Sequence, residues 1–172
     1  MKSIIVLSDT HGNRAEIEKL YPLFSECDYI IHLGDTSSDG ARIRSSFPGK
    51  VYLVNGNCDI PRLGEDELEL EIEGVKIFAC HGDKFGVKRG TAELEAKARA
   101  AGAKVALFGH THDAIEKDAG DLTLFNPGTL SRYAAIKSYL YLAVYDGKFT
   151  GKIAEIQSVT YTHLTLPTNS RV

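Results

Sequence analysis

The first third of the chain alternates short apolar runs with amphipathic stretches. Three continuous runs rich in β-branched residues, at 4–7, 29–33 and 51–54, predict buried strands. The stretches between them predict helices, one broken or restarted at Pro22 and one that ends before Pro48. This order of strand, helix, strand, helix and strand favours a parallel sheet with helical crossovers.

The first of these helices has a capping-box-like start. Asn13 stands where an N-cap is expected, and Glu16 follows three residues later. Ile17, Leu20 and Phe24 then form an apolar stripe at helical spacing. The pattern therefore predicts a helix that begins just after Asn13 and buries one face.

The rest of the chain predicts a second group of strands. Residues 67–73 alternate Glu with Leu or Ile, and Gly74 leads into a hairpin partner at 75–79. A solvated sheet face explains this acidic row better than a cation site does. Apolar runs and turn signals predict four further strands and a helix: strands at 105–108, 122–125, 139–145 and 149–156, and a helix at 93–101 that stops at Gly102.

No repeat or linker divides residues 1–157, which we expect to form one domain. Residues 158–172 are different: they are rich in Thr and have no clear period. Their sequence resembles the conceptual translation of a sequencing adapter, and a disordered natural tail is the alternative. We assign no function to His163 on either interpretation.

Composition and charge exclude several classes of protein. The chain has 172 residues, 43% of them apolar and 25% charged, as is typical of a soluble domain. A net charge of -3 without a basic run argues against nucleic acid as a bulk partner, and no apolar stretch is long enough to span a bilayer. Three irregularly spaced cysteines and an early aspartate, which argues against a signal peptide, favour a cytoplasmic location.

Similar polar residues follow five of the predicted strands. The segments are Ser8-Asp9-Thr10-His11-Gly12, Gly34-Asp35, Gly56-Asn57-Cys58-Asp59, Cys80-His81-Gly82-Asp83 and Gly109-His110-Thr111-His112. Each residue alone has an ordinary explanation as a turn former, a helix cap or a hydrogen-bonded histidine. Ligands of open α/β sheets bind outside the carboxyl ends of strands, so we expect these side chains to converge. As a set, they point to a functional site.

The donor types at these strand ends suit divalent metals. Carboxylate, amide oxygen and imidazole favour manganese, iron or zinc, and the lack of a thiolate cluster argues against a structural zinc site. Two cations about 3.5–4 Å apart can polarise a phosphoryl group and hold a hydroxide nucleophile. One carboxylate must bridge them, and Asp35 is the candidate. The cations would also supply the positive charge that a phosphate substrate needs on a mildly acidic protein.

The five blocks resemble, in order and spacing, the signature of the calcineurin-like metallophosphoesterases. The resemblance covers residues 1–156, and the short chain and Asn126-Pro127-Gly128-Thr129 are similar to the small bacterial and archaeal YfcE-type phosphodiesterase branch. The eukaryotic retromer subunit built on the same fold is also similar. The resemblance implies an α/β (α+β) fold, a four-layer αββα sandwich of two mixed β-sheets flanked by helices. A homodimer is plausible by resemblance only.

The resemblance also implies roles for individual residues. It places one metal on Asp9, His11, Asp35 and His112, and the second on Asp35, Asn57, His81 and His110. Manganese is the expected metal, with iron, nickel and zinc open. A metal-bridging hydroxide would attack phosphorus in line, without a covalent phospho-enzyme. Asp35, Asn57 and His81 would be catalytic, and Asn57 and Cys58 would contact the substrate.

Two positions depart from the family pattern. Many relatives have a histidine general acid where this chain has Cys58, and a neutral thiol is a poor proton donor. Some relatives have a histidine where this chain has Asp83, which could support His81 or, as we favour, form a turn. Asp59, Lys84, Lys88 and Arg89 could contact a substrate phosphate, but a solvated surface is favoured for each.

We therefore expect a dinuclear phosphodiesterase that acts on a small or activated phosphodiester. The alternative within the enzyme class is a phosphomonoesterase or nucleotidase. A second alternative is a non-catalytic scaffold like the retromer subunit. That role is associated with the loss of metal ligands, and all seven are present here. The scaffold is therefore the less favoured alternative.

Overall fold

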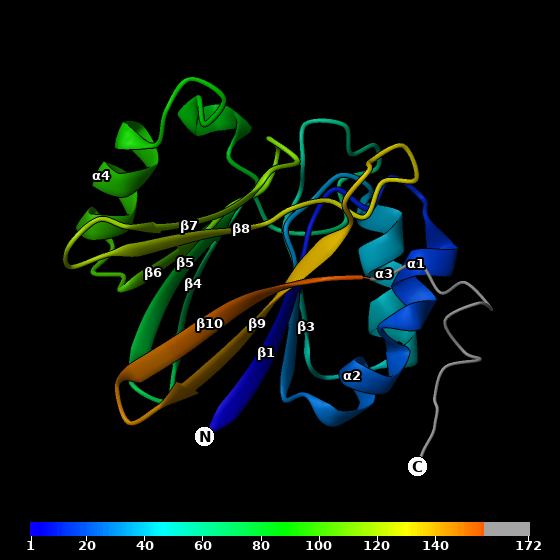
Figure 1. Ribbon diagram of the computed structural model, residues 1–172, viewed down its shortest axis with the longest axis horizontal. Helices are drawn as coiled ribbons and strands as arrows, with labels where there is room; N and C mark the ends of the chain where they lie inside the picture. The colour runs from blue at the N-terminus through cyan, green and yellow to red at the C-terminus, as the bar shows by residue number, and fades with distance from the viewer. Residues whose placement is uncertain (157–172) are drawn as a thin grey trace, which may run out of the picture.

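The computed structural model describes residues 1–156, which form two five-stranded sheets packed face to face (Figure 1). The first sheet has the order β10 (Lys148–Glu155), β9 (Ser138–Tyr145), β1 (Lys2–Leu7), β2 (Tyr29–His32) and β3 (Val51–Leu53). The second has the order β4 (Glu67–Ile72), β5 (Val75–Cys80), β6 (Val105–Leu107), β8 (Thr123–Pro127) and β7 (Ala114–Asp118). The tail predicted at 158–172, with His163, lies outside the described residues.

Three helices cover the outer face of the first sheet. They are α1 (Arg14–Lys19), α2 (Tyr21–Glu26) and α3 (Ser37–Ser46). The strands β1, β2 and β3 are parallel, so the predicted crossovers are confirmed, while β9 and β10 add antiparallel strands beside β1. Ile5 and Ile30 of the sheet pack against Phe24 and Ile43 of the helices, which gives the helices a buried face.

The helix α4 (Ala92–Ala100) covers the outer face of the second sheet (Figure 1). Leu94 and Ala98 on this helix pack against Phe78 and Phe108. The sheet is mixed, because β5, β6 and β8 are parallel whereas β4 and β7 are antiparallel edge strands. With the first sheet and its helices, this makes the expected four-layer sandwich, which is confirmed.

The core between the sheets explains the continuous apolar runs of the sequence. Successive side chains of a strand point to opposite faces. Ile4 and Val6 of β1 therefore face the second sheet, whereas Ile5 and Leu7 face the helices. Phe125 of β8 enters the same central core from the opposite side. A strand covered on both faces needs apolar residues at every position, and β1 has them.

Local details correct some of the predictions. The capping box at Asn13 and Glu16 is wrong, because the Asn13 side chain makes no capping bond and donates to the Leu130 carbonyl at 2.8 Å. The restart at Pro22 is confirmed, since this residue lies in the first turn of α2, where a missing N–H costs little. Strand β7 was not predicted: four of its five residues are exposed and only Ile115 packs inward, so no alternation marks it.

The acidic row on β4 is solvated, as expected, with Glu67, Glu69 and Glu71 exposed and Leu68 and Leu70 packed on the core. Among the helices of residues 1–156, none combines the length and apolar character needed to cross a membrane.

The tight fit between the sheets generates a stability prediction at Gly151. A Cβ atom there would lie 2.5 Å from Cζ of the buried Phe125 ring. We expect Gly151→Ala to lower the free energy of unfolding, measured by urea denaturation, by about 1–3 kcal/mol through overpacking. Thr150→Ala, an exposed position on the same strand, should change it by less than about 0.5 kcal/mol. Equal effects of the two variants would contradict this packing account.

Candidate metal centre

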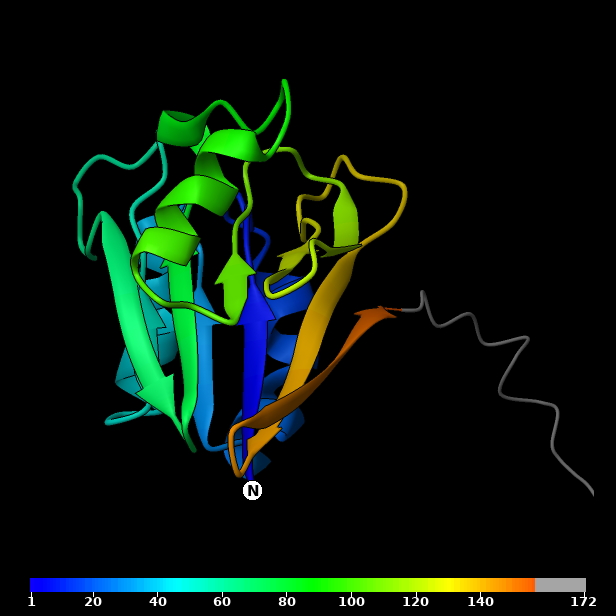
Figure 2. The same ribbon diagram turned by 90° about the vertical axis from the view of Figure 1, so that its left-hand side faces the viewer.

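The strand ends of both sheets meet at one end of the molecule. The loops that follow β1, β2 and β3 lie there with the yellow loop after β8 (Figures 1 and 2). Backbone hydrogen bonds join neighbouring strand ends within each sheet: Asp9 N–H donates to the Gly34 carbonyl at 2.9 Å, and Gly109 N–H donates to the His81 carbonyl at 2.8 Å. The His110 N–H donates to Asp9 Oδ2 at 3.0 Å and joins the two sheets. These bonds fix the predicted site residues relative to one another.

One group of donors comes from the loops after β1 and β6. Asp9, His11 and His112 each offer a donor atom, and these atoms lie within 4.8 Å of one another. Asp9 Oδ1 lies 3.2 Å from His112 Nε2 and 3.9 Å from His11 Nε2. The two imidazole nitrogens are 3.3 Å apart. One carboxylate oxygen and two imidazoles thus face a common point.

A second group combines Asp35, His81 and His110 within the same limit of 4.8 Å. His81 Nε2 lies 3.4 Å from Asp35 Oδ2, and the ring of His81 packs edge-on against His110 at 5.0 Å. His81 Nδ1 lies 2.8 Å from the Leu33 carbonyl, which can only accept a hydrogen bond. Nδ1 therefore carries the proton in the neutral ring and Nε2 is left to bind a metal.

The two groups are in contact through the most buried carboxylate. Asp9 Oδ1 is 3.9 Å from His81 Nε2, so this oxygen faces ligands of both groups. Asp9 Oδ2 is satisfied by the Ser8 hydroxyl at 2.5 Å and the His110 N–H at 3.0 Å. Within residues 1–156, Asp9 Oδ1 and His81 Nε2 are buried atoms without a hydrogen-bond partner. Divalent cations would satisfy both atoms, so the residues fit a pair of metal ions.

Glycines make room beside the carboxylates. A Cβ atom on Gly56 would lie 2.0 Å from Asp35 Oδ1, and one on Gly109 would lie 2.7 Å from Asp9 Oδ2. Any side chain at either position would therefore collide with a donor group. This explains why glycine precedes the polar residue in these two blocks of the sequence.

The candidate ligands hold an unusual backbone conformation. Five of the seven have positive φ angles: Asp9 (53°), His11 (45°), Asp35 (49°), His110 (70°) and His112 (66°). Residues with a Cβ rarely adopt this region, and each instance costs about 1–3 kcal/mol. Such strain gathers at functional sites, where the surrounding structure holds it in place. At these five residues the positive φ angles bend the backbone away from the direction of the preceding strand, and the donor groups face the centre.

Asp59 is a correction to the sequence prediction. We expected it on a solvated surface, but it is 4% exposed. Its carboxylate accepts backbone N–H groups from Asp35 at 3.0 Å, Ser37 at 2.6 Å and Gly56 at 2.6 Å. It therefore joins the loops after β2 and β3 and fixes Asp35. A turn position after Asn57 carries no sequence signal for such a role.

His32 and Asp39 are further supports that the sequence did not single out. His32 Nδ1 accepts the Gly34 N–H at 3.1 Å, so Nε2 is the protonated nitrogen and donates to Thr10 Oγ1 at 3.0 Å. Thr10 then donates to Asp39 Oδ2 at 2.6 Å, which also accepts the Gly12 N–H at 2.9 Å. Full burial lowers the pKa of His32, which keeps its ring neutral. The chain of bonds holds the loop that carries Asp9 and His11.

Asn57 and Cys58 lie on the exposed edge of the centre. The Cys58 N–H donates to Asp35 Oδ1 at 2.9 Å, and Asn57 Nδ2 contacts Cys58 Sγ at 3.6 Å. Burial and the nearby Asp35 carboxylate raise the pKa of the Cys58 thiol. The structure thus brings six of the seven expected ligands into the two groups. Ligation by Asn57 and bridging by Asp35 stay predictions.

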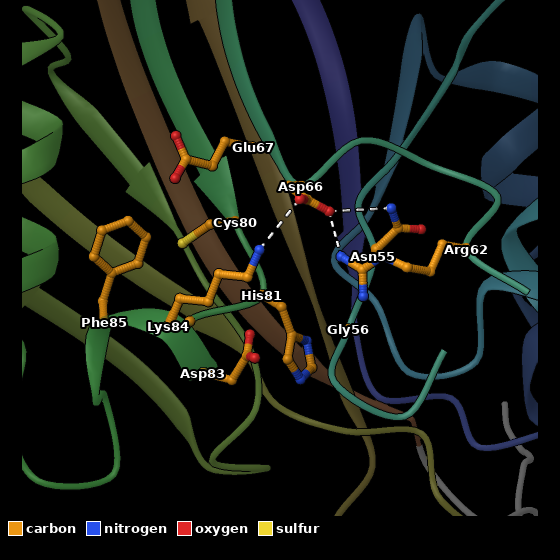
Figure 3. Close-up of a pocket in the computed structure, with 11 residues that line it drawn as sticks. Asn55, Gly56, Arg62, Asp66, Glu67, Cys80, His81, Asp83, Lys84 and Phe85 are labelled. Carbon is orange, nitrogen blue, oxygen red and sulfur yellow. Dashed lines mark hydrogen bonds and ion pairs between the residues drawn. The ribbon is translucent and has the colours of Figure 1, made fainter. Parts of the chain in front are cut away.

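A small pocket beside His81 contains charged side chains that pair with one another (Figure 3). Lys84 Nζ lies 3.2 Å from the Asp66 carboxylate, which also pairs with Arg62. Arg62 and Lys84 lower the pKa of Asp66 to about 2. Asp83, in the short 3₁₀ helix η1 (Asp83–Phe85), takes the turn position that we favoured.

Lys84, Lys88 and Arg89 are exposed, as expected of a solvated surface.

The two buried carboxylates govern the protonation of the centre. Burial disfavours a charged imidazole, but Asp35 and Asp9 outweigh it and raise the pKa of His81 to about 9. Burial also disfavours charged carboxylates, yet the neighbouring imidazoles and hydrogen-bond donors lower the pKa values of Asp9 and Asp35. The Asp9 carboxylate raises the pKa of His112, whereas burial lowers that of His110.

Known proteins are similar to this chain over most of its length. The family model for the calcineurin-like phosphoesterase superfamily domain matches residues 1–147. A probable metallophosphoesterase of Methanocaldococcus jannaschii is 36% identical over 157 residues, which cover 88% of this chain and 80% of that protein. The phosphodiesterase YfcE of Escherichia coli is 25% identical over 158 residues, which cover 76% of this chain and 80% of that protein.

Solved structures share the fold. A predicted phosphoesterase from Streptococcus pneumoniae superposes with a TM-score of 0.76 at 24% identity, over 90% of this chain and 89% of that chain. Vps29 of Entamoeba histolytica, in a complex with Zn²⁺, superposes with a TM-score of 0.71 at 17% identity, over 89% of this chain and 98% of that chain.

The raised pKa of His81 predicts that metal affinity depends on pH. In the metal-free protein, His81 keeps its proton up to a pH of about 9, whereas an ordinary histidine loses it at about 6.5. A cation that binds to His81 must therefore displace this proton. We expect manganese affinity, measured by isothermal titration calorimetry, to rise roughly tenfold per unit between about pH 6 and 8. In the metal-free protein, the His81 ion pairs contribute stability that is complete below pH 6.5 and is lost as pH rises through about 9.

Titrations in two buffers of different ionisation enthalpy should report the released proton. An affinity that stays constant over this pH range would contradict competition at His81.

Proposed function

The chain belongs to the calcineurin-like phosphoesterase superfamily, and on that premise we propose that it is a phosphodiesterase that uses two divalent cations. The family resemblance of its five sequence blocks is thereby confirmed. One observation carries the proposal: Asp9, His11 and His112 form one donor group, and Asp35, His81 and His110 form another in contact with it. Two such groups side by side suit the in-line displacement of a phosphoester.

Two observations support a diester rather than a monoester as the substrate. Phosphodiesterases are named among the more distant relatives, such as YfcE at 25% identity. In addition, Asp66 forms ion pairs with both Arg62 and Lys84, the cationic side chains beside His81, so one of the two positive charges is compensated and both groups are held by the carboxylate. A diester carries one negative charge, whereas a monoester dianion carries two and gains more from free cations. The proposed substrate is therefore a small phosphodiester.

Manganese is the proposed metal, because carboxylate oxygen and imidazole donors suit it. When bound, the two cations would polarise the phosphoryl group and lower the pKa of the attacking water. Zinc, iron and nickel suit the same donors, and the family fold is known with Zn²⁺ in Vps29 of Entamoeba histolytica.

The chain's own residues orient this chemistry. The bond between His81 Nδ1 and the Leu33 carbonyl points Nε2 into the centre. Asp59 holds the backbone of Asp35, and the Cys58 N–H fixes one Asp35 oxygen. We propose that Asn57, exposed beside Cys58, adds an amide oxygen to the second group. These contacts keep the donors in position before substrate arrives.

Chromogenic esters test the proposed reaction. Metal-free protein should cleave bis(p-nitrophenyl) phosphate faster than p-nitrophenyl phosphate, and only after manganese is added. Asp35→Asn should lose at least about 100-fold in kcat/KM, because it removes a charged donor from the second group. Asp121→Asn, which alters an exposed ion pair with Arg99, is the matched control and should retain activity.

Faster cleavage of the monoester would favour the phosphomonoesterase alternative. Folded protein that cleaves neither ester with any divalent metal would favour the scaffold alternative.

Cys58 generates a second prediction about the leaving group. A thiol donates a proton to a departing oxygen less readily than the histidine that many relatives have at this position. The enzyme should therefore prefer methyl p-nitrophenyl phosphate to methyl phenyl phosphate strongly, since p-nitrophenolate leaves without a proton. Cys58→His should reduce that preference, measured as a ratio of kcat/KM values, by roughly tenfold.

Cys58→Ala is the control and should leave the preference as it is. A Cys58→His variant with an unchanged ratio would rule out a leaving-group role for this position.

A further inference from the structure

Two buried aspartates lie behind the candidate ligands and belong to neither donor group. Asp39 is 2% exposed and Asp59 is 4% exposed. Burying a carboxylate is unfavourable unless hydrogen bonds compensate for the lost water. Both carboxylates accept such bonds from the loops that carry the ligands, and the two sets of bonds go to different loops.

Asp39 holds the loop after β1 on both sides of His11. One oxygen, Oδ2, accepts the Thr10 hydroxyl at 2.6 Å and the Gly12 N–H at 2.9 Å. The other oxygen pairs with the Arg42 guanidinium at 3.2 Å, which orients the carboxylate. His11 lies between these two donors with a positive φ of 45°, which is unfavourable without support from its surroundings. Asp39 therefore holds His11, which belongs to the first donor group, in its ligand position.

Asp59 has the corresponding place behind the second donor group. Its Oδ2 accepts the N–H of Asp35 at 3.0 Å and that of Gly56 at 2.6 Å. Its Oδ1 accepts the Ser37 N–H at 2.6 Å. Asp35 is a member of the second group, and Gly56 precedes Asn57, the expected seventh ligand. The bonds of Asp59 therefore end at ligands of the second group.

The two carboxylates act on separate parts of the centre. Among residues 1–156, no donor binds both of them. What the loops share is a backbone bond, from the Thr10 N–H to the Asp35 carbonyl at 2.8 Å. A side-chain substitution at Asp39 leaves this backbone bond in place, so its effect should fall on the first group.

We propose that Asp39 is the positioning residue for the first of the two cations. It holds His11 through both neighbours of that residue, and so it sets the affinity of the ion bound by Asp9, His11 and His112. The ion at the second group depends on Asp59 instead. This inference rests on the proposed function for the presence of two cations. It adds a means by which the chain controls their affinities separately.

Metal binding tests the proposal without turnover. Calorimetric titration of the metal-free protein with manganese gives the two dissociation constants, and anomalous peaks from crystals grown at limiting manganese assign each constant to a site. Asp39→Ala should weaken the ion at the first group by roughly tenfold, the order expected when a group that orients a metal ligand is removed. The ion at the second group should change little.

An asparagine at the same position separates hydrogen bonding from charge. Asp39→Asn should retain most of the affinity of the first ion, because an amide oxygen can accept the same two bonds. Its amide nitrogen would face Arg42, whose side chain is 41% exposed and can turn toward solvent. A loss in Asp39→Asn as large as in Asp39→Ala would overturn positioning by these bonds.

Three further variants complete the test. Asp59→Ala is the matched comparison and should weaken the second ion at least as much as the first, because it releases Asp35. Ser38→Ala, at an exposed position on α3, should change neither ion. Thr10→Val removes the hydroxyl but keeps a β-branched shape, so it should weaken the first ion selectively even where Asp39→Ala does not fold.

Selectivity decides between positioning and a purely structural role. Equal weakening of both ions in Thr10→Val and Asp39→Ala, with the variants shown to be folded by circular dichroism, would overturn the proposal. Unchanged affinity of the first ion in these variants would overturn it as well.

The proposal and the proposed function fail separately. Two bound manganese ions with an Asp39-dependent first site, but no cleavage of either p-nitrophenyl ester, would keep the role of Asp39 and remove the phosphodiesterase. Cleavage of bis(p-nitrophenyl) phosphate together with equal weakening of both ions would do the reverse.

Discussion

The site depends on the buried carboxylate of Asp9, which follows a strand of the first sheet and lies against imidazoles that follow strands of the second sheet. One of its oxygens is fully hydrogen-bonded by Ser8 and His110, while the other faces imidazoles from both donor groups and has no hydrogen-bond donor among residues 1–156. A buried anion without a compensating charge is costly, so positive charge in the centre stabilises the loops around it. A protonated His81 supplies that charge in the metal-free protein, and divalent cations supply it when bound.

The backbone around this carboxylate is locally unfavourable, but it positions the donor groups. Positive φ angles at five of the seven expected ligands are unfavourable, and glycines next to Asp9 and Asp35 contribute no packing of their own. The buried Asp59 carboxylate and the bonds of His32 with Thr10 compensate by fixing the loops. Conflict between local preference and the global fold at such positions is typical of functional sites. The same network extends through Thr129 to the loop between β8 and β9.

The apolar runs predicted most strands and the parallel crossovers, because two-sided burial leaves a direct trace in runs such as that of β1, whereas the four layers were implied by the family resemblance. Grouping of the ligands was predictable because strand ends converge, and six of the seven expected residues lie together. The supports were not predictable: Asn13 and Asp59 act through backbone groups distant in sequence, which no local pattern reveals. Edge strand β7 shows no alternation of apolar and polar residues, because four of its five residues are exposed.

Crystals grown with manganese test the central claim most directly, because anomalous scattering locates the ions without any assumption about the reaction. The account predicts two peaks, one between Asp9, His11 and His112 and the other between Asp35, His81 and His110. A single peak, or peaks bound elsewhere while these side chains keep their positions, would contradict a dinuclear centre built from the two donor groups.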